Sequence, residues 1–137
     1  MANRFYPLGK GAMFKAFLGL AVAPVTPVVK AVLVKNTYVY DASHVDVSSI
    51  TAHQIATPVS LAGLSISGST LDASDLSPGF TDATVGESVS AVILFVEDGL
   101  DSYLLLYIDD ADITVFPMLV GANRVDVVWN VAGIARL

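Results

Sequence analysis

The stretch that decides the fold is Val89-Ser90-Ala91-Val92-Ile93-Leu94-Phe95-Val96, followed by Glu97-Asp98-Gly99-Leu100-Asp101 and Ser102-Tyr103-Leu104-Leu105-Leu106-Tyr107-Ile108. An Asp-Gly pair between two apolar runs is a strong short-range signal for a β-hairpin. We therefore predict strands over Val89–Val96 and Ser102–Ile108, with the turn at Glu97–Asp101. Both runs are almost continuously apolar, which is typical of strands that are covered on both faces.

Short runs on both sides of this hairpin have the same β character. Val28–Lys35 is rich in β-branched residues, and Leu64-Ser65-Ile66-Ser67 alternates between Gly63 and Gly68. Further strands are predicted after the hairpin at Ile113–Phe116, Val125–Trp129 and Ile134–Leu137, with a loop at Pro117–Ala122. Many short strands with a turn about every ten residues predict a mainly β fold, as a single-domain β-sandwich or barrel.

Two polar segments are predicted to connect the strands. Asp41–Thr51 can form a single helical turn that Asp46 or Ser48 would cap. Asp72–Glu87 is rich in Ser, Asp, Gly and Pro, and we expect it to be a connection that Phe80 anchors to the core.

The N-terminal residues differ from the rest of the chain. Apolar residues recur there at offsets of three and four, which predicts a short helix over residues 8–20 with one apolar face: Met13, Phe14, Phe17, Leu18 and Ala21. Three glycines in this stretch each cost up to about 1 kcal/mol inside a helix, so the helix needs packing against other elements. We divide the chain into a helical or extended arm at residues 1–27 and a β body at residues 28–137.

Charge is divided by position along the chain. Residues 1–36 carry five basic side chains and no acid, whereas residues 37–137 carry all thirteen acids and two arginines. The two parts have formal charges of +5 and −11, which together make the net charge of −6. Because opposite potentials steer association, such a chain can attract copies of itself.

Composition points to assembly rather than catalysis. Apolar residues make up 54% and charged residues 15%, against about 45–50% and about 25% in average chains. This excess favours burial against neighbours in a homo-oligomer, and a tightly packed monomer with short aliphatic side chains is the alternative.

Several classes of function are disfavoured by what the chain lacks. The absence of cysteine excludes disulfides and thiolate chemistry. An acidic body argues against broad nucleic-acid binding, and no apolar run reaches the roughly 18–20 residues that span a membrane. The run Ala16–Ala23 resembles a signal peptide, but Gly19 interrupts it and Pro24 would follow the cleavage site, so we expect it to be retained.

Acidic residues in and after the hairpin form a candidate cluster: Glu97, Asp98, Asp101, Asp109, Asp110 and Asp112. Their spacing is not that of a calcium-binding loop, and a solvated turn is the commoner explanation. We interpret the cluster as an acidic edge that receives the basic arm of a neighbouring subunit. The interface residues expected on that arm are Arg4, Phe5, Tyr6, Lys10, Met13, Phe14, Lys15, Phe17 and Leu18.

No residue pattern predicts a catalytic, metal or cofactor site. His44 and His53 could join Asp41 or Asp46 around a metal, but surface histidines in a polar segment are far commoner. Serines are abundant, yet no Gly-x-Ser-x-Gly elbow is present. The aromatic residues of the β body, Tyr103, Tyr107 and Trp129, are interpreted as core or interface residues.

Several stretches together resemble a known group of proteins. They are Met1-Ala2-Asn3-Arg4-Phe5, Lys30-Ala31-Val32-Leu33-Val34, Tyr38-Val39-Tyr40-Asp41-Ala42-Ser43-His44, Phe116-Pro117, Val125-Asp126-Val127-Val128-Trp129-Asn130 and Ile134-Ala135-Arg136-Leu137. In this order they resemble small structural proteins of tailed-bacteriophage virions. The chain departs from that pattern because it lacks an Asp-Gly after the Trp-containing strand and a Phe near the C-terminus.

The resemblance implies a non-enzymatic virion component present in many copies, most similar to a head decoration (cement) protein. It implies self-association, as trimers at threefold positions of the capsid, and contact with the major capsid protein. The alternatives are a structural role in the tail, at the head–tail junction or in a fibre base. A small-molecule or metal-binding β-barrel, or a hydrolase on that scaffold, is a less favoured alternative.

Overall fold

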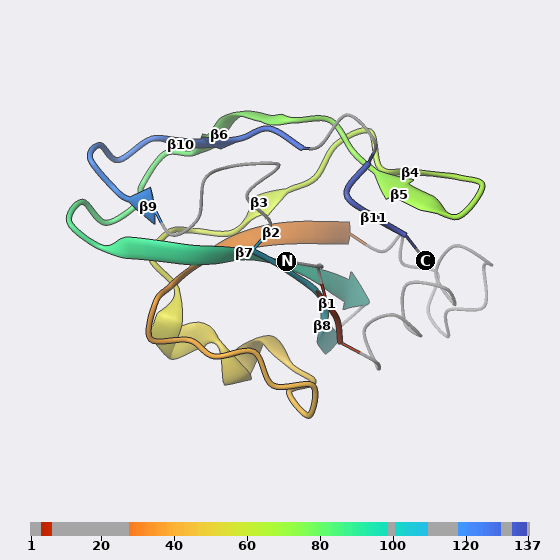
Figure 1. Ribbon diagram of the computed structural model, residues 1–137, viewed down its shortest axis with the longest axis horizontal. Helices are drawn as coiled ribbons and strands as arrows, with labels where there is room; N and C mark the ends of the chain where they lie inside the picture. Colours follow the sequence, from red (N-terminus) through yellow and green to blue (C-terminus); the bar gives the residue numbers. More distant parts are fainter. Residues whose placement is uncertain (1–3, 7–27, 99–100, 110–117, 130–132, 137) are drawn as a thin grey trace.

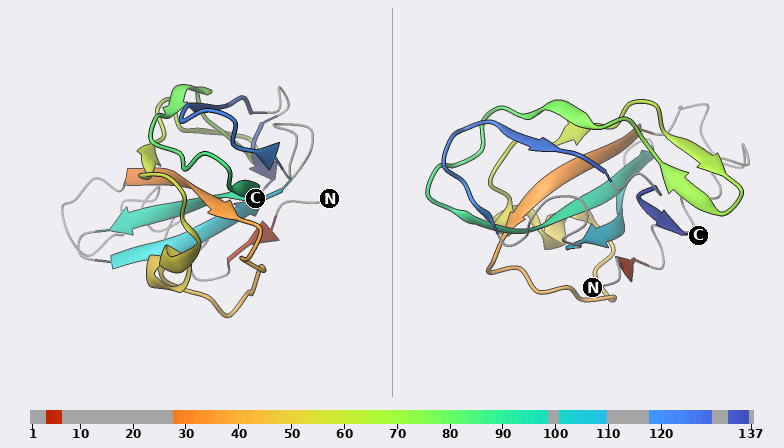
Figure 2. Two further views of the ribbon diagram at one scale, coloured as in Figure 1. Left: turned by 90° about the vertical axis from the view of Figure 1, so that its left-hand side faces the viewer. Right: turned by 45° about the horizontal axis from the view of Figure 1, so that its top comes forward.

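The computed structural model describes residues 4–6, 28–98, 101–109, 118–129 and 133–136. In this part of the chain the fold is mainly β with antiparallel pairing, as the sequence predicts. Figure 1 shows a main sheet with a layer of short strands over one face and a layer of loop and helical turns over the other. Figure 2 shows the same layers from two further directions.

The main sheet has the strand order β1-β8-β7-β2-β3, and β9 also pairs with β7. The bounds of its strands are β1 (Arg4–Phe5), β2 (Val28–Lys35), β3 (Val59–Ser60), β7 (Ser88–Asp98), β8 (Asp101–Ile108) and β9 (Met118–Leu119). The predicted hairpin is confirmed, since β7 and β8 pair from Val92↔Ile108 to Asp98↔Asp101. Its turn is shorter than predicted, because both strands extend into the expected turn. The loop expected at Pro117–Ala122 is wrong, because β9 lies within it.

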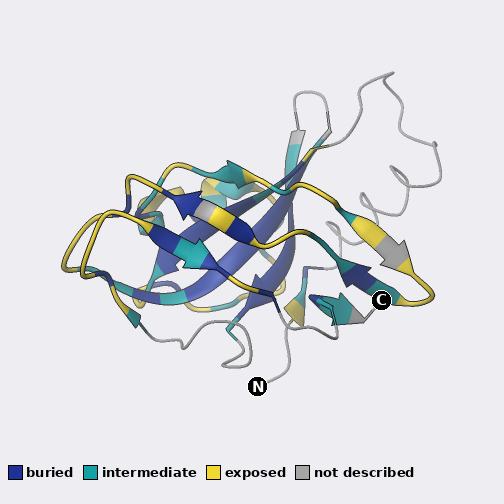
Figure 3. Ribbon diagram, turned by 90° about the horizontal axis from the view of Figure 1, so that it is seen from above, coloured by how far each residue is buried: buried dark blue, intermediate teal, exposed yellow. Residues whose placement is uncertain are grey.

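The continuous apolar character of β7 is explained by the two cores that its opposite faces contact. Alternate residues from Val92 to Val96 pack into the core between the main sheet and the short-strand layer. The residues between them, Ile93 and Phe95, pack into a second core on the opposite face. Both faces of the hairpin are therefore covered, as predicted, and Figure 3 shows the central strands as buried.

The layer above the first core consists of two small sheets. One pairs β6 (Leu76–Phe80) with β10 (Val125–Val127), and the other has the order β11-β5-β4, with β4 (Ser65–Ser67), β5 (Thr70–Asp72) and β11 (Ala135–Arg136). Phe80 is completely buried, so its predicted role as an anchor is confirmed. The connection expected over Asp72–Glu87 is wrong, because β6 occupies its middle.

The missing side chain of Gly79 and the carboxylate of Asp126 explain why a strand forms in that polar segment. A Cβ atom at Gly79 would lie 2.4 Å from the carbonyl oxygen of Val125, so only glycine permits the two strands to approach there. The Gly79 N–H donates to Oδ1 of Asp126 at 2.9 Å, where the β6–β10 register shifts. A side chain thus replaces a backbone acceptor at this irregular position.

Residues 36–54 cover the second core. This segment contains two short 3₁₀ helices, η1 (Val47–Ser49) and η2 (Thr51–His53). Asp46 caps η1, since its Oδ1 accepts the Ser48 N–H at 2.8 Å, which confirms the predicted cap. The segment also bonds to β8, because the Leu104 N–H donates to the Val45 carbonyl at 2.8 Å. Ile50 is fully buried beneath the two turns.

The predicted boundary between arm and body does not hold for the first described residues. β1 is a strand of the main sheet, with Arg4 opposite Tyr107 and Phe5 opposite Leu106. The helix predicted over residues 8–20 and the strand predicted at Ile113–Phe116 lie outside the described residues. In the part of the chain that is described, no helix is long and apolar enough to cross a membrane.

Candidate functional site

Tyrosines gather beneath the N-terminal strand, at the edge of the main sheet. Tyr6 directly follows β1 and continues its pairing, since its N–H donates to the Leu105 carbonyl at 2.8 Å. Its side chain is completely buried. The ring centroids of Tyr6 and Tyr40 are 5.1 Å apart, and those of Tyr40 and Tyr107 are 5.5 Å apart. These distances are those of interacting aromatic pairs.

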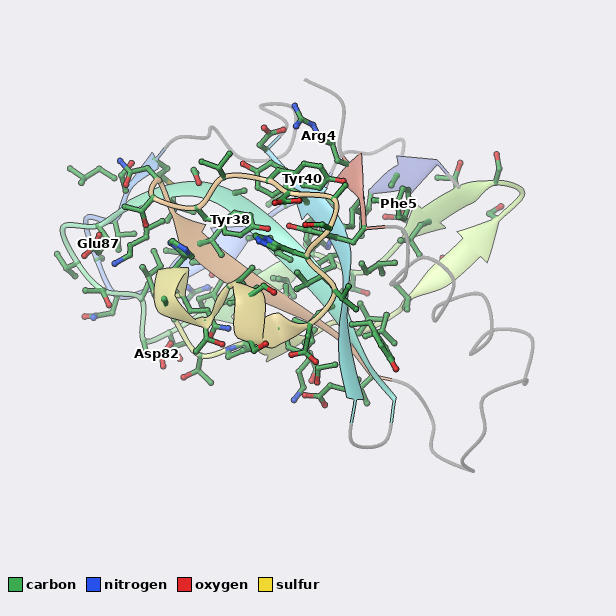
Figure 4. All side chains as sticks on the ribbon, turned by 90° about the horizontal axis from the view of Figure 1, so that it is seen from below. Arg4, Phe5, Tyr38, Tyr40, Asp82 and Glu87 are labelled. Carbon is green, nitrogen blue, oxygen red and sulfur yellow. The ribbon has the colours of Figure 1, made fainter. Side chains whose placement is uncertain are left out.

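Arg4, Phe5 and Tyr6 each have their own contact with the segment that follows β2. The Arg4 guanidinium carbon lies 5.1 Å from the Tyr40 ring centroid, within the range of a cation–π contact. The Tyr40 hydroxyl donates to the Phe5 carbonyl at 2.9 Å. The Tyr6 and Tyr38 hydroxyl oxygens lie 2.5 Å apart. Figure 4 shows Arg4 and Tyr40 close together, with Tyr38 further along the same segment.

Burial keeps Tyr6, Tyr38 and Tyr107 in the neutral, hydrogen-bonding form. Burial raises the pKa of Tyr6, and the hydrogen bond with Tyr38 raises it further. Burial also raises the pKa of Tyr38, although the hydrogen bond with Tyr6 opposes the shift. The pKa of Tyr107 is raised by burial first and then by the nearby Asp109 carboxylate. A neutral phenol both donates and accepts, so the cluster can form a continuous hydrogen-bond chain.

Both histidines pack against the ring of Tyr38. His44 and His53 have ring centroids 5.8 Å and 5.5 Å from that of Tyr38. The His44 Nδ1 atom lies 3.1 Å from the Tyr38 hydroxyl, which gives the chain Tyr6–Tyr38–His44. His53 bonds instead to Thr37, with 2.8 Å between Nδ1 and Oγ1.

Among the described residues, the positions of the candidate ligands give little support to a metal site at these histidines. The Nε2 atom of His44 lies 3.9 Å from Oδ2 of Asp41, while Asp46 is engaged in capping η1. The described part of the chain holds no group of three or more metal-ligating side chains. The structure therefore places both histidines beside a tyrosine rather than around a shared carboxylate.

The predicted acidic edge is divided by the hairpin. Glu97, Asp98 and Asp101 lie at its tip, whereas Asp109 follows the other end of β8. Eight residue steps along a strand separate Asp101 from Asp109 by about 26 Å. Asp110 and Asp112 lie outside the described residues. The expectation of one cluster is wrong for the described acids, because neighbours in the sequence mark opposite ends of a strand.

Glu97 at the hairpin tip and Asp109 after the far end of β8 also have different surroundings. Glu97 pairs with Lys30 of the same chain, with 3.1 Å between Oε1 and Nζ. Oδ1 of Asp109 is buried and has no hydrogen-bond partner among the described residues. Among the described side chains, the basic partner of Glu97 at the hairpin tip is thus Lys30 of β2.

Three of the predicted arm residues contact their own chain. Arg4, Phe5 and Tyr6 lie against β8 and residues 38–40, rather than extending away from the body. The other predicted arm residues lie outside the described part: Lys10, Met13, Phe14, Lys15, Phe17 and Leu18. The sequence placed Tyr38 and Tyr40 only within the stretch that leads to His44, and it did not link them to Tyr6. The available signal was the Arg-Phe-Tyr triplet that precedes Pro7.

Comparison with known proteins identifies no relative of this chain. No protein-family model matches the chain, and neither the curated proteins nor the solved structures give a match.

Proposed function

We propose that this chain is a non-enzymatic structural protein of a tailed-bacteriophage virion, and that it acts as a head decoration (cement) protein. The observation that carries the proposal is the separation of charge. Residues 1–27 have a formal charge of +3 and residues 28–137 one of −9, which together make −6. The resemblance of several stretches to small virion proteins and the high apolar content support the same role.

The N-terminal strand fixes the point at which the basic segment leaves the sheet. β1 and Tyr6 are held on the sheet edge by Tyr38 and Tyr40. The chain that leaves Tyr6 is basic and apolar, and it would bind an acidic neighbouring surface. Burying Phe14, Phe17 or Leu18 there is worth roughly 1.5–3 kcal/mol each, before the cost of ordering the segment.

Copy number in purified particles tests the proposal. Quantitative mass spectrometry against the major capsid protein should give a number comparable to that of the capsid protein. A small fraction of it would move the protein to the tail, the head–tail junction or a fibre base. Absence from purified particles would contradict the virion role and favour a binding protein instead.

The contribution of the arm is best tested without disturbing β1. Deletion of residues 1–20 would remove Tyr6 from the core, so a loss of head binding would not distinguish the arm from the fold. Lys15→Glu changes the arm charge alone, and Lys35→Glu makes the same change on β2. We expect Lys15→Glu to weaken binding to heads in a pelleting assay more than Lys35→Glu does. Equal effects would contradict a role for the arm.

A further inference from the structure

We infer that the site which holds β1 and Tyr6 also accepts the N-terminal strand of a second copy, so that neighbouring copies exchange these strands. This inference deepens the proposed function, on which its biological setting rests, by naming the partner as a second copy of the chain and Tyr6 as the residue it supplies. Its physical basis is the geometry around β1.

The contacts described for β1 and Tyr6 are with the body of the chain. Their backbone partner is the outer edge of β8, through Leu105, Leu106 and Tyr107. Their side-chain partners are Tyr38 and Tyr40. Any copy of the strand can therefore make the same contacts.

The connection between Tyr6 and Val28 is far longer than the gap that it closes. β1 and β2 are three strand spacings apart in the sheet, which is about 14 Å. Tyr6 lies opposite Leu105, and Val28 lies level with Ser102 through Glu97, so the ends are about 17 Å apart. The intervening 21 residues, 7–27, can reach up to about 70 Å. Chain connectivity thus does not decide which copy's site the strand occupies.

The concentration of other copies decides which copy's site the strand occupies. Exchange replaces every contact of β1 with the same contact in the neighbour, so the contact energy is unchanged. The balance is between the effective concentration of the tethered strand, on the order of millimolar, and the local concentration of other copies. Dilute chains should keep their own strands, whereas chains packed side by side on a particle should exchange them.

Charge favours the crossed arrangement between adjacent copies. Two bodies with a formal charge of −9 each repel one another when they are close. A strand that crosses from each copy brings a segment with a charge of +3 into the space between them. Arg4 lies within this segment and already contacts Tyr40 in the site.

Disulfide trapping between folded chains tests the exchange directly, because the chain has no cysteine of its own. Arg4 and Tyr107 are register partners, and cross-strand partners lie within disulfide range. The variants Arg4→Cys and Tyr107→Cys are purified separately, mixed at about 1 mM and at a hundredfold dilution, and oxidised. We expect a disulfide between the two variants that becomes more abundant at the higher concentration, identified by non-reducing electrophoresis and peptide mass spectrometry.

The control pair is Val28→Cys with Glu97→Cys, which are register partners inside the main sheet. A folded chain does not release β2 as readily as an edge strand, so this pair reports random collisions. Interchain bonding of the Arg4/Tyr107 pair no greater than that background would overturn the inference, provided that the double variant of one chain forms its intrachain bond. If Tyr107→Cys does not fold, the partners Phe5→Cys and Leu106→Cys provide the same test. Failure of the trapping would leave the copy-number test of the virion role unaffected.

Discussion

The hydroxyl groups of Tyr6 and Tyr38 lie 2.5 Å apart in the buried core, so a hydrogen bond between side chains 32 positions apart joins the N-terminal strand to the segment after β2. β1 itself is only two residues long. Backbone pairing of that length is weak, since short strands depend on their side-chain packing. The position of β1 is therefore determined largely by the tyrosine cluster.

Removing the Tyr6 hydroxyl should destabilise the protein by about 1 kcal/mol, because the Tyr38 hydroxyl loses a buried partner. Tyr6→Ala should cost about 3–5 kcal/mol, because it also leaves a cavity. Urea unfolding of Tyr6→Phe and Tyr6→Ala measures both values. Val39→Ala is the control, since Val39 is 78% exposed and its truncation should change the stability by less than about 0.5 kcal/mol. An unchanged free energy of unfolding for Tyr6→Ala would contradict the packing of β1.

Stability should fall at alkaline pH. The folded state raises the pKa values of Tyr6, Tyr38 and Tyr107, so between pH 10 and those raised values the unfolded chain has lost protons that the folded chain retains. The neutral tyrosines therefore stabilise the fold fully below pH 10, and this contribution is lost as the pH rises further. Urea midpoints between pH 8 and pH 11 measure the loss. Tyr6→Phe should show a shallower decline, and an equal decline would contradict the assignment.

Asp126 should contribute to stability above pH 4 and lose that contribution towards pH 2. Hydrogen bonds from Arg124 and then from the Gly79 N–H lower its pKa from 3.8 to about 2. A lowered pKa means that the folded state favours the carboxylate, so protonation between pH 4 and pH 2 removes the stabilisation. Asp126→Asn should therefore lower the melting temperature at pH 7 and flatten its dependence on pH in this window.

Two of the partners of Asp126, Arg124 and the Gly79 N–H, can be separated by a matched variant. Arg124→Gln removes the exposed ion pair but leaves the bond to Gly79, which holds β6 beside β10. Exposed pairs contribute little, so Arg124→Gln should lower the melting temperature less than Asp126→Ala, which also removes the acceptor of the Gly79 N–H. An equal loss for both variants would show that the ion pair, rather than the backbone bond, is what matters.

Phe80→Ala should destabilise the protein by about 3–5 kcal/mol, because Phe80 is completely buried between β6 and the main sheet. Chemical denaturation measures the loss. Val128→Ala, at a position that is 53% exposed in the same layer, should have an effect below about 0.5 kcal/mol. Similar losses for both variants would contradict the packing of the short-strand layer on the first core.

The elements that the sequence predicted well are those with a local signal. The Asp98-Gly99 turn between two apolar runs predicted β7 and β8, and β-branched residues predicted β2 over its full length. Asp46 predicted a cap because capping depends on residues two and three positions away. Segment 76–80 was misinterpreted because its strand character depends on Asp126, which lies far away in the sequence.

The candidate site was predicted only in part for the same reason. Arg4, Phe5 and Tyr6 were expected to make contacts, but as an interface with a neighbour. No sequence pattern linked them to Tyr38 and Tyr40. The acidic residues were grouped by their proximity in the sequence, whereas the strand between Asp101 and Asp109 separates them. Proximity in the sequence is a poor guide to proximity in space wherever an extended strand intervenes.

By itself the sequence determined the β character of the chain, the central hairpin, the covering of both its faces and the uneven distribution of charge. These follow from residue types and their spacing, which act over a few positions. Only the tertiary structure decided that the N-terminal strand lies on β8, that Tyr6 meets Tyr38, and that Asp126 holds Gly79. Those contacts join residues that are 32 to more than 100 positions apart, and they form because the folded sheet brings together side chains with complementary shape and hydrogen bonding.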